Sequence, residues 1–504
     1  MRTFSIAVAL YALSAAAQFP PLQFGFGQTG IATALDPGSV ATYQLGISSQ
    51  FDDLHGVKLQ FNWPDGVTLT DISQMRIPCT TSANGLTCTL DFLRKQTSYN
   101  GLFRLRMPPT DAVPDIIITG SATSETPSLS QQAKATTHLT HILSITNTND
   151  GGAGSLRDVI ETANRECVTA ARLCKIYNDI TAPPASDGLH LIEPQTPLPA
   201  LTACAFFFDA GNPRQSSIPD DPTIHLSGAK QPFGNGLEIR STCTGLKQFR
   251  GIVIDGFPEN GVAMTAGGQS GTVVLQELII SNNRLRGVAV ADPLSTLGIS
   301  SSKILRNRFS GVALFASRGA SITRSEISGN GASGVFALTV GVFDSTIAFN
   351  RDAGISILPG GKLMTGGMTF VGNVSQPIDW KIDGPTPDDS NESDGVPNAP
   401  ELLDAHYDAS TGITTLTGRL HTRIGIFGQL FAVAVYIDGH TLGTKSLWGV
   451  GGPVKFGDDF DHIFTIEMNG DFTGKPVSLQ TIFTMWSDLG PENASELSPP
   501  RVVQ

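Results

Sequence analysis

The chain has 504 residues, of which 40% are hydrophobic, 15% are charged and 54 are glycines, and its formal net charge is −12. This acidic balance excludes nucleic acid as the expected partner, because binding to phosphates requires a basic surface. The length predicts about three domains, and the glycine-rich composition fits an all-β extracellular protein.

The N-terminal segment has the features of a secretory signal peptide. Arg2 precedes an apolar run from Phe4 to Leu13, and small residues follow it. The pattern predicts a signal peptide over residues 1–17 that is cleaved near Gln18. The run is too short to span a membrane, which takes about twenty apolar residues, and no later segment is long enough. We therefore expect a mature chain that is secreted or held in the cell envelope, without a membrane span.

Six cysteines in an exported chain predict disulfides rather than metal ligands, and the absence of a CxxC pair disfavours zinc. Six cysteines allow fifteen pairings, and we favour the partners that lie near each other in the sequence. The expected pairs are Cys79–Cys88, Cys167–Cys174 and Cys204–Cys243.

After a linker over residues 18–32, residues 33–140 predict a β-sandwich. Apolar residues alternate along short segments that end in turns, as at Val57, Leu59 and Phe61. The segments LDPGSVATYQL, WPDGVTL, CTTSANGLTCTL and IIITGSATSETP resemble the repeated Ig-like modules of bacterial surface and secreted proteins. This resemblance implies a spacer or adhesion module rather than an enzyme.

The residue pattern changes at Ile142, where the sequence reads ILSITNTNDGGAGSLRDVIETANRE. In this segment Ser155 is expected to cap a helix. The helix would carry four apolar residues on one side: Leu156, Val159, Ile160 and Ala163. Such a helix suits the open end of a solenoid, which needs a cap. The segment resembles the GSLR(E/Q)AI segment of bacterial proteins with a CSLREA-type β-helix domain. The segments LHLIEPQTPLPAL with FFFDAG and GLEIRS with FRGIVIDGF resemble the first coils of that family, which is known by its architecture more than by an activity.

A short phrase returns six times between Ile254 and Trp380, at intervals of 20 to 26 residues. In most copies an Ile is followed three residues later by Asn, and four residues after that by a Gly with Val or Ile. This interval is typical of a solenoid, and the period-two spacing of the apolar residues predicts strands rather than helices. We therefore predict a capped, right-handed parallel β-helix over residues 141–403. Its inward column would include Ile280, Ile304, Ile327 and Ile347.

The asparagines of the phrase are expected to stack from coil to coil as a structural turn ladder. The predicted ladder is Asn283, Asn307, Asn330, Asn350 and Asn373.

The residue after the turn asparagine is arginine in three coils and glycine in a fourth: Arg284, Arg308, Arg351 and Gly331. Stacked arginines would make a positive stripe on an acidic protein, and guanidinium groups pair well with carboxylates. Two interpretations stay open. The stripe binds an acidic polysaccharide, or these are solvated corners with local partners such as Glu326 and Asp352.

Parallel β-helices also carry polysaccharide lyases and hydrolases, which need paired carboxylates, or calcium with a basic residue. The segment from Ile254 to Trp380 contains no His and no Tyr, and its acids fall at different positions of the repeat. The acids considered are Asp255, Glu259, Glu277, Asp292, Glu326, Asp344 and Asp352. Catalytic residues therefore stay unknown. The first hypothesis is a structural or binding protein that recognises polysaccharide or another cell-surface component, and the alternative is a polysaccharide lyase or glycoside hydrolase.

The segment that leaves the coil is rich in oxygen ligands at a spacing loosely like that of a calcium loop. The candidate ligands are Asp388, Asp389, Asn391 and Asp394. The loop lacks the bidentate Glu of such sites, so a calcium site and a polar exit loop remain the two alternatives. No other cofactor is expected.

Residues 404–504 return to a β pattern, with alternation at Phe431, Val433, Val435 and Ile437. The segment WSDLGPENASELSPP resembles the end of the small Ig-like domain that often follows such coils. We therefore predict an all-β chain in which two Ig-like sandwiches flank the β-helix.

Overall fold

The computed structural model describes residues 22–29, 34–170, 172–210, 222–384, 398–423, 430–446, 459–484 and 494–504. The chain divides into two compact units, Met1–Thr140 and His141–Gln504. The predicted signal peptide lies outside the described residues. Among the residues that are described, no helix has the length and apolarity needed to cross a bilayer.

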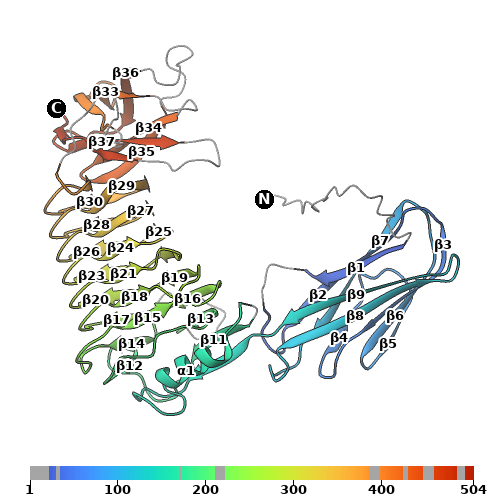
Figure 1. The fold of residues 1–504 in the computed structure, drawn as a ribbon. Helices are drawn as coiled ribbons and strands as arrows, with labels where there is room; N and C mark the ends of the chain where they lie inside the picture. Colours follow the sequence, from blue (N-terminus) through green and yellow to red (C-terminus); the bar gives the residue numbers. More distant parts are fainter. Residues whose placement is uncertain are drawn as a thin grey trace. The chain divides into compact units, whose positions relative to one another are not determined.

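The first unit consists of two antiparallel sheets that share one apolar core (Figure 1). The first sheet has the order β1 (Leu22–Gln28), β2 (Val40–Ser49), β7 (Thr97–Arg106) and β4 (Thr68–Asp71). The second has the order β5 (Cys79–Ser82), β6 (Gly85–Leu93), β3 (Leu54–Asn62), β8 (Asp115–Ser124) and β9 (Leu129–His138). The inward faces bury the alternating residues that the sequence indicates, including Val57, Leu59 and Phe61, each 1% exposed or less.

The second unit begins with strand β10 (His141–Ile145) and the single described helix, α1 (Leu156–Glu166). Ser155 is the N-cap residue, and its hydroxyl accepts a hydrogen bond from the Asp158 amide at 3.2 Å. All four predicted apolar residues of the helix are buried. They belong to the same core as the coils that follow. The predicted helix cap is therefore confirmed.

The coils stack as three parallel sheets, which follow one another around each circuit (Figure 1). The first sheet contains β12 (His190–Ile192), β14 (Ile224–Ser227), β17 (Ile252–Asp255), β20 (Ile279–Ser281), β23 (Lys303–Leu305), β26 (Glu326–Ser328), β28 (Thr346–Ala348) and β30 (Thr369–Val371). The second contains β15 (Leu237–Arg240), β18 (Val262–Thr265), β21 (Val288–Ala291), β24 (Val312–Ala316), β27 (Val335–Phe343), β29 (Ile355–Gly366) and β31 (Ile378–Trp380). The third contains β10, β11 (Leu173–Asn178), β13 (Ala205–Asp209), β16 (Leu246–Arg250), β19 (Thr272–Gln276), β22 (Thr296–Ser300) and β25 (Gly319–Thr323), and the long strands β27 and β29 run on into it.

The predicted isoleucine column lies in the centre of the β-helix. Ile280 is the register partner of Ile304, Ile304 of Ile327, and Ile327 of Ile347. Each of the four is 0% exposed. Because these successive coils place isoleucine directly on isoleucine, the core is continuous along the axis, and the predicted parallel β-helix is confirmed.

The asparagine ladder joins the same coils through buried amides. The Asn330 side-chain oxygen accepts hydrogen bonds from the Asn307 amide nitrogens of the main chain, at 3.0 Å, and of the side chain, at 3.1 Å. The Asn330 side-chain nitrogen donates to the Asn350 oxygen at 3.0 Å. The same pattern links Asn283 to Asn307 and Asn350 to Asn373. Each side chain thus satisfies donors that no strand partner could reach.

Three disulfides form in the pairing expected for cysteines near each other in the sequence. Cys79–Cys88 joins β5 to β6 in the first unit. Cys167–Cys174 closes the loop between α1 and β11, and Cys204–Cys243 links a residue just before β13 to the turn after β15. The described residues contain no free cysteine.

The C-terminal strands form two further antiparallel layers. The three-stranded sheet has the order β32 (Glu401–Asp408), β33 (Ile413–Arg423) and β36 (Asp459–Asn469). The other layer has the order β35 (His440–Ser446), β34 (Leu430–Ile437), β37 (Pro476–Thr484) and β38 (Ala494–Leu497), with β39 (Arg501–Val502) also on β37. Strand β35 pairs antiparallel with β30 at His440 and Thr369, so this layer continues the first sheet of the β-helix.

Strand β34 is buried on both faces, whereas its alternating pattern alone indicates a strand with one buried face. Val433 and Val435 pack in the C-terminal core. Ala434 and Tyr436, which alternate with these valines along the strand, pack in the core of the β-helix. The indole of Trp380 in the last coil donates a hydrogen bond to the Ala494 carbonyl at 3.2 Å. The C-terminal layer therefore covers the open end of the coils.

An ion pair occupies the outer side of the first coils. The His225 ring lies between two carboxylates, with Nε2 3.9 Å from Asp255 Oδ2 and Nδ1 3.7 Å from Asp187 Oδ2. Interaction with Asp255 raises the pKa of His225, while His225 and the donors Ser281 and Asn282 lower the pKa of Asp255 to about 2. Both groups are therefore charged at mildly acidic pH.

The ladder predicts a strong dependence of stability on Asn330. Asn330→Ala removes the acceptor of two buried Asn307 donors, and each orphaned donor costs about 1–3 kcal/mol. We expect the free energy of unfolding in urea to fall by at least about 2 kcal/mol. Arg308→Ala, which changes an exposed side chain next to the ladder, is the control and should alter it by less than about 0.5 kcal/mol. Equal stabilities of the two variants would contradict the role assigned to the ladder.

The His225–Asp255 pair predicts a pH-dependent contribution to stability. The raised pKa of His225 gives stability that is complete below its ordinary value of 6.5 and is lost as pH rises through the folded value. The lowered pKa of Asp255 gives stability that is present above 3.8 and is lost as pH falls toward about 2. The difference in unfolding free energy between the parent and His225→Gln should therefore be larger at about pH 5.5 than at about pH 8.5, by up to about 1 kcal/mol. The comparison repeated in an Asp255→Asn background should lose most of this difference, and a difference that persists there would assign it to other groups.

Candidate functional site

The arginines singled out in the sequence lie at one corner of the β-helix, in the turn between the first and second sheets. We call Arg284, Arg308 and Arg351 the arginine ladder. Their main-chain amides donate to equivalent carbonyls one coil earlier: Arg308 to Asn283 at 3.0 Å and Arg351 to Asn330 at 2.9 Å. All three side chains are exposed. The turn thus stacks them on one edge, with adjacent coils about 4.8 Å apart.

The arginine ladder is free of local carboxylate partners. Within the described part of the chain, no acidic side chain forms an ion pair with any of the three arginines. The two acids expected to serve as partners are bonded to serines instead. Glu326 accepts a hydrogen bond from Ser328 at 2.8 Å, and Asp352 accepts one from Ser333 at 3.1 Å. The positive charge of the ladder is therefore available to a ligand.

The ladder is interrupted at Gly331 for a steric reason. A Cβ atom at this position would collide with the Arg308 carbonyl oxygen. No side chain fits there, so Arg308 and Arg351 are separated by two coil spacings, or about 9.6 Å. The interruption leaves a gap in the stripe between these two guanidinium groups.

An aromatic surface adjoins the ladder on the side of the second sheet. We call Arg286, Phe309, Phe315 and Phe336 the aromatic platform. The Arg286 Cζ atom lies 4.6 Å from the centroid of the Phe315 ring and 5.7 Å from that of Phe309, which is a cation–π arrangement. The Phe315 and Phe336 rings are 5.8 Å apart between centroids. Phe309 and Phe315 are 43% and 44% exposed, so the platform faces solvent.

Phe315 follows the inward Leu314 and points outward, and a bulge lies at the same position of the strand. The register of β21 and β24 shifts between Val290 and Ala291, so that Ala291 pairs with Ala316 and Phe315 is the extra residue of a bulge. Partial burial against the rings lowers the pKa of the Arg286 guanidinium from its ordinary value, although it stays protonated at neutral pH.

The outer column of the second sheet changes in character along the axis. Successive register partners are Ala289, Ala313, Phe336, Ser356 and Asp379. The column thus runs from two alanines through the platform residue Phe336 to a serine and then an aspartate, at about 5 Å per coil. The face has an aromatic and cationic part and an acidic end.

At the acidic end, the carboxyl group of Asp379 interacts with those of Asp352 and Asp383. Burial raises the pKa of Asp379, and the charges of Asp352 and Asp383 raise it further, against hydrogen bonds that lower it. Ser333 links the neighbourhood together, since its hydroxyl donates to Asp352 and lies 2.8 Å from the Ser356 hydroxyl. Asp379 is 6% exposed. A carboxyl group whose pKa is raised by burial has one property of a general acid.

The candidate calcium ligands Asp388, Asp389, Asn391 and Asp394 lie outside the described residues. Among the side chains that the structure does place, no three His, Cys, Asp or Glu are arranged to hold a metal ion.

Sequence reasoning selects the arginine ladder but misses the groups around it. Arg286 lies two residues beyond the ladder position. Its aromatic partners Phe309 and Phe315 do not recur at the same positions of the other coils, so they form no repeat. Asp379 belongs to the last and least regular copy of the repeat. The signal that was available is the departure of these residues from the repeat, since an arginine or phenylalanine at an outward position has no role in the core.

Sequence comparison covers the repeats. Residues 234–379 match the family model described as a right handed beta helix region. No curated protein sequence matches the chain significantly.

Solved structures give distant likenesses. One is bacteriophage CBA120 tailspike protein 2, enzymatically active domain, at 8% identity and a TM-score of 0.21, covering 70% of this chain and 76% of that one. Another is the major pilin subunit BcpA of Bacillus cereus, at 10% identity and a TM-score of 0.21, covering 25% of this chain and only 44% of the pilin. A cohesin–dockerin complex from Clostridium thermocellum matches at 9% identity and a TM-score of 0.19, covering 25% of this chain and 99% of that one.

TM-scores this low do not establish a shared fold. The family match and the coordinates agree independently of them, because the in-register strands of residues 234–379 close the circuits that the family description names. The central part of this chain is a right-handed parallel β-helix.

Proposed function

We propose that the chain is an extracellular binding protein that recognises an acidic polysaccharide on one corner of its β-helix. The observation that carries this proposal is the exposed, unpaired arginine ladder directly beside the exposed aromatic platform. In an acidic chain with a net charge of −12, a localised stripe of unpaired arginines is selective for anionic groups.

The two parts of the corner suit two parts of a uronate-containing glycan. Guanidinium groups bind carboxylates through charge-assisted, bidentate hydrogen bonds. Pyranose rings carry C–H groups on their faces, and such apolar faces pack on exposed aromatic rings. Arg286 holds Phe309 and Phe315 in place, so that the platform is preorganised and loses little entropy on binding. The glycan would run along the axis of the coils.

An extracellular location is supported by the three disulfides, because such bonds persist in oxidising compartments. The signal peptide expected over residues 1–17 belongs to the same proposal. Within it, residues 33–140 act as an Ig-like spacer or adhesion module, and residues 404–504 as an Ig-like module that also closes the coil.

A second candidate function is cleavage of the bound polysaccharide. The observation that favours it is Asp379, whose pKa is raised by burial beside Asp352 on the platform's own face of the sheet. Glycan hydrolysis uses one protonated and one ionised carboxyl group. Asp379 would serve as the acid and Asp352 as its partner.

The binding proposal predicts that the arginine ladder controls affinity for acidic glycans. Arg284→Ala with Arg308→Ala removes two charge-assisted contacts, and we expect the affinity for polygalacturonate or alginate to fall at least about tenfold. Phe315→Ala should weaken binding as well, through loss of ring packing. Titration calorimetry with the full chain measures both.

The matched control removes the same charge elsewhere on the coil. Arg324 and Lys362 are exposed and lie away from the ladder. Arg324→Ala with Lys362→Ala should keep the parent affinity. Binding that survives the loss of Arg284 and Arg308, or that falls equally in the control, would end the proposal for this corner.

The cleavage candidate predicts release of products from the same polymers. Incubation with polygalacturonate or alginate should generate reducing ends or unsaturated uronates, and Asp379→Asn should slow their release at least about 100-fold. The calorimetric affinity of Asp379→Asn should stay close to that of the parent. Products formed at an unchanged rate by this variant would remove Asp379 from the chemistry.

A further inference from the structure

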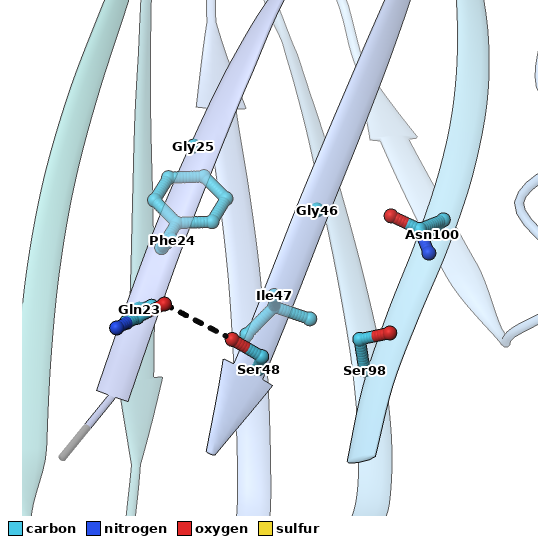
Figure 2. Close-up of a pocket in the computed structure, with 8 residues that line it drawn as sticks. All are labelled: Gln23, Phe24, Gly25, Gly46, Ile47, Ser48, Ser98 and Asn100. Carbon is cyan, nitrogen blue, oxygen red and sulfur yellow. Dashed lines mark hydrogen bonds between the residues drawn. The ribbon is translucent and has the colours of Figure 1, made fainter. Parts of the chain in front are cut away.

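A shallow pocket lies on the outer face of the four-stranded sheet in the N-terminal unit (Figure 2). Its cavity volume is about 410 Å³, within the range of small-ligand sites. Two rows of residues cross the sheet there. One row is Gln23, Ser48 and Ser98, and the other is Gly25, Gly46 and Asn100.

The floor of this pocket is bare backbone at Gly25 and Gly46, which are register partners. A Cβ atom at Gly25 would meet no atom within 4 Å, and its backbone is not in the left-handed region. Neither packing nor conformation therefore requires glycine at this position. Glycine weakens a strand, and in a strand it often marks a bulge, a bend, or the close approach of a ligand or another backbone. Strands β1 and β2 pair here without a register shift, which disfavours a bulge.

The walls carry uncharged hydrogen-bonding groups. The Ser48 hydroxyl donates to the Gln23 side-chain oxygen at 3.5 Å. The Asn100 amide leans over Gly46, with its oxygen 3.2 Å from where a Cβ would lie. Figure 2 shows Ser98 and Asn100 side by side on β7, each with its polar atoms beyond the sheet surface. No ionisable side chain lines the pocket.

This chemistry selects the occupant. The absence of charge disfavours anions and cations, and the polar walls disfavour a lipid. Amides and hydroxyls both donate and accept hydrogen bonds, which matches the vicinal hydroxyls of a sugar. A pyranose ring lying flat over Gly25 and Gly46 would reach peptide planes that any larger residue would cover.

We propose that this glycine-floored pocket is a second carbohydrate site that binds a neutral sugar unit. It lies in the other unit of the chain and does not depend on the arginine ladder. The chain would then bind an acidic polysaccharide on its β-helix and a neutral one on its N-terminal sheet.

The test places a side chain over the glycine floor of the pocket by a substitution that the strand can accommodate. Gly25→Val places a strand-favouring residue into open space, so the variant should fold at least as stably as the parent. The control is Gly27→Val, on the same strand and face, where a Cβ also meets no atom within 4 Å but the residue does not line the pocket. Asn100→Ala removes one wall amide.

Titration calorimetry uses the full chain with dextran, galactomannan and mixed-linkage β-glucan as neutral probes, and polygalacturonate as the acidic one. We expect at least one neutral polymer to bind. Gly25→Val should weaken it at least about tenfold, by steric exclusion, and Asn100→Ala about three- to tenfold. Gly27→Val should bind like the parent, and polygalacturonate should bind all variants equally.

Three results would overturn the proposal. The first is that no neutral polymer binds the full chain, and the second is that Gly25→Val binds as tightly as the parent. The third is an equal loss in Gly25→Val and Gly27→Val, which would place the effect outside the pocket. Light scattering adds a further arm, because a dimer abolished by Gly25→Val would show that the face joins two copies of the chain instead. Failure of the ladder variants with polygalacturonate leaves these readouts unaffected, so the two proposals fail separately.

Discussion

The structure depends on one constraint: each coil must repeat the backbone path of the coil before it, one strand spacing away. The inward isoleucines find apolar neighbours only if they stack, and the buried asparagine amides find acceptors only in the adjacent coil. Hydrophobic burial supplies most of the favourable free energy, whereas the amides make a slipped register costly because they would lose their partners. The apolar core and the asparagine corner thus both favour the same register between adjacent coils.

The need for every coil to follow the same path explains which features could be read from the sequence. Ile304 and Asn330 were predictable because most coils need the same residue type at that point, so the requirement appears as a repeat. The cap helix was predictable from Ser155 and the spacing of its apolar side. The burial of Ala434 and Tyr436 was not, because it depends on contact with coils that lie far earlier in the chain. Phe315 was missed because a single outward aromatic residue in one coil leaves no periodic trace, although its outward position follows from the alternation of the strand.

The contrast between inward positions, which must repeat, and outward positions, which need not, explains where a site can arise. Outward side chains do not pack in the core, so the surface residues of a single coil can change without disturbing the neighbouring coils. Arg286 and Phe315 use this freedom, and Asp379 uses it three coils further along. The regular part of the repeat provides rigidity, and the irregular part provides chemistry. A rigid support keeps the ladder and platform at fixed separations, which limits the entropy lost when a long polymer is bound.

The closure of the coil at Trp380 has a consequence for assembly. A bare terminal circuit would offer unpaired main-chain groups and an apolar cross-section, and another copy could add to it head to tail without limit. Here β35 occupies the edge of β30, and Glu496 accepts a hydrogen bond from the Trp380 main-chain amide at 3.0 Å. At the opposite end, α1 packs onto the core, so the apolar cross-section is covered at both ends and head-to-tail addition of further copies is hindered.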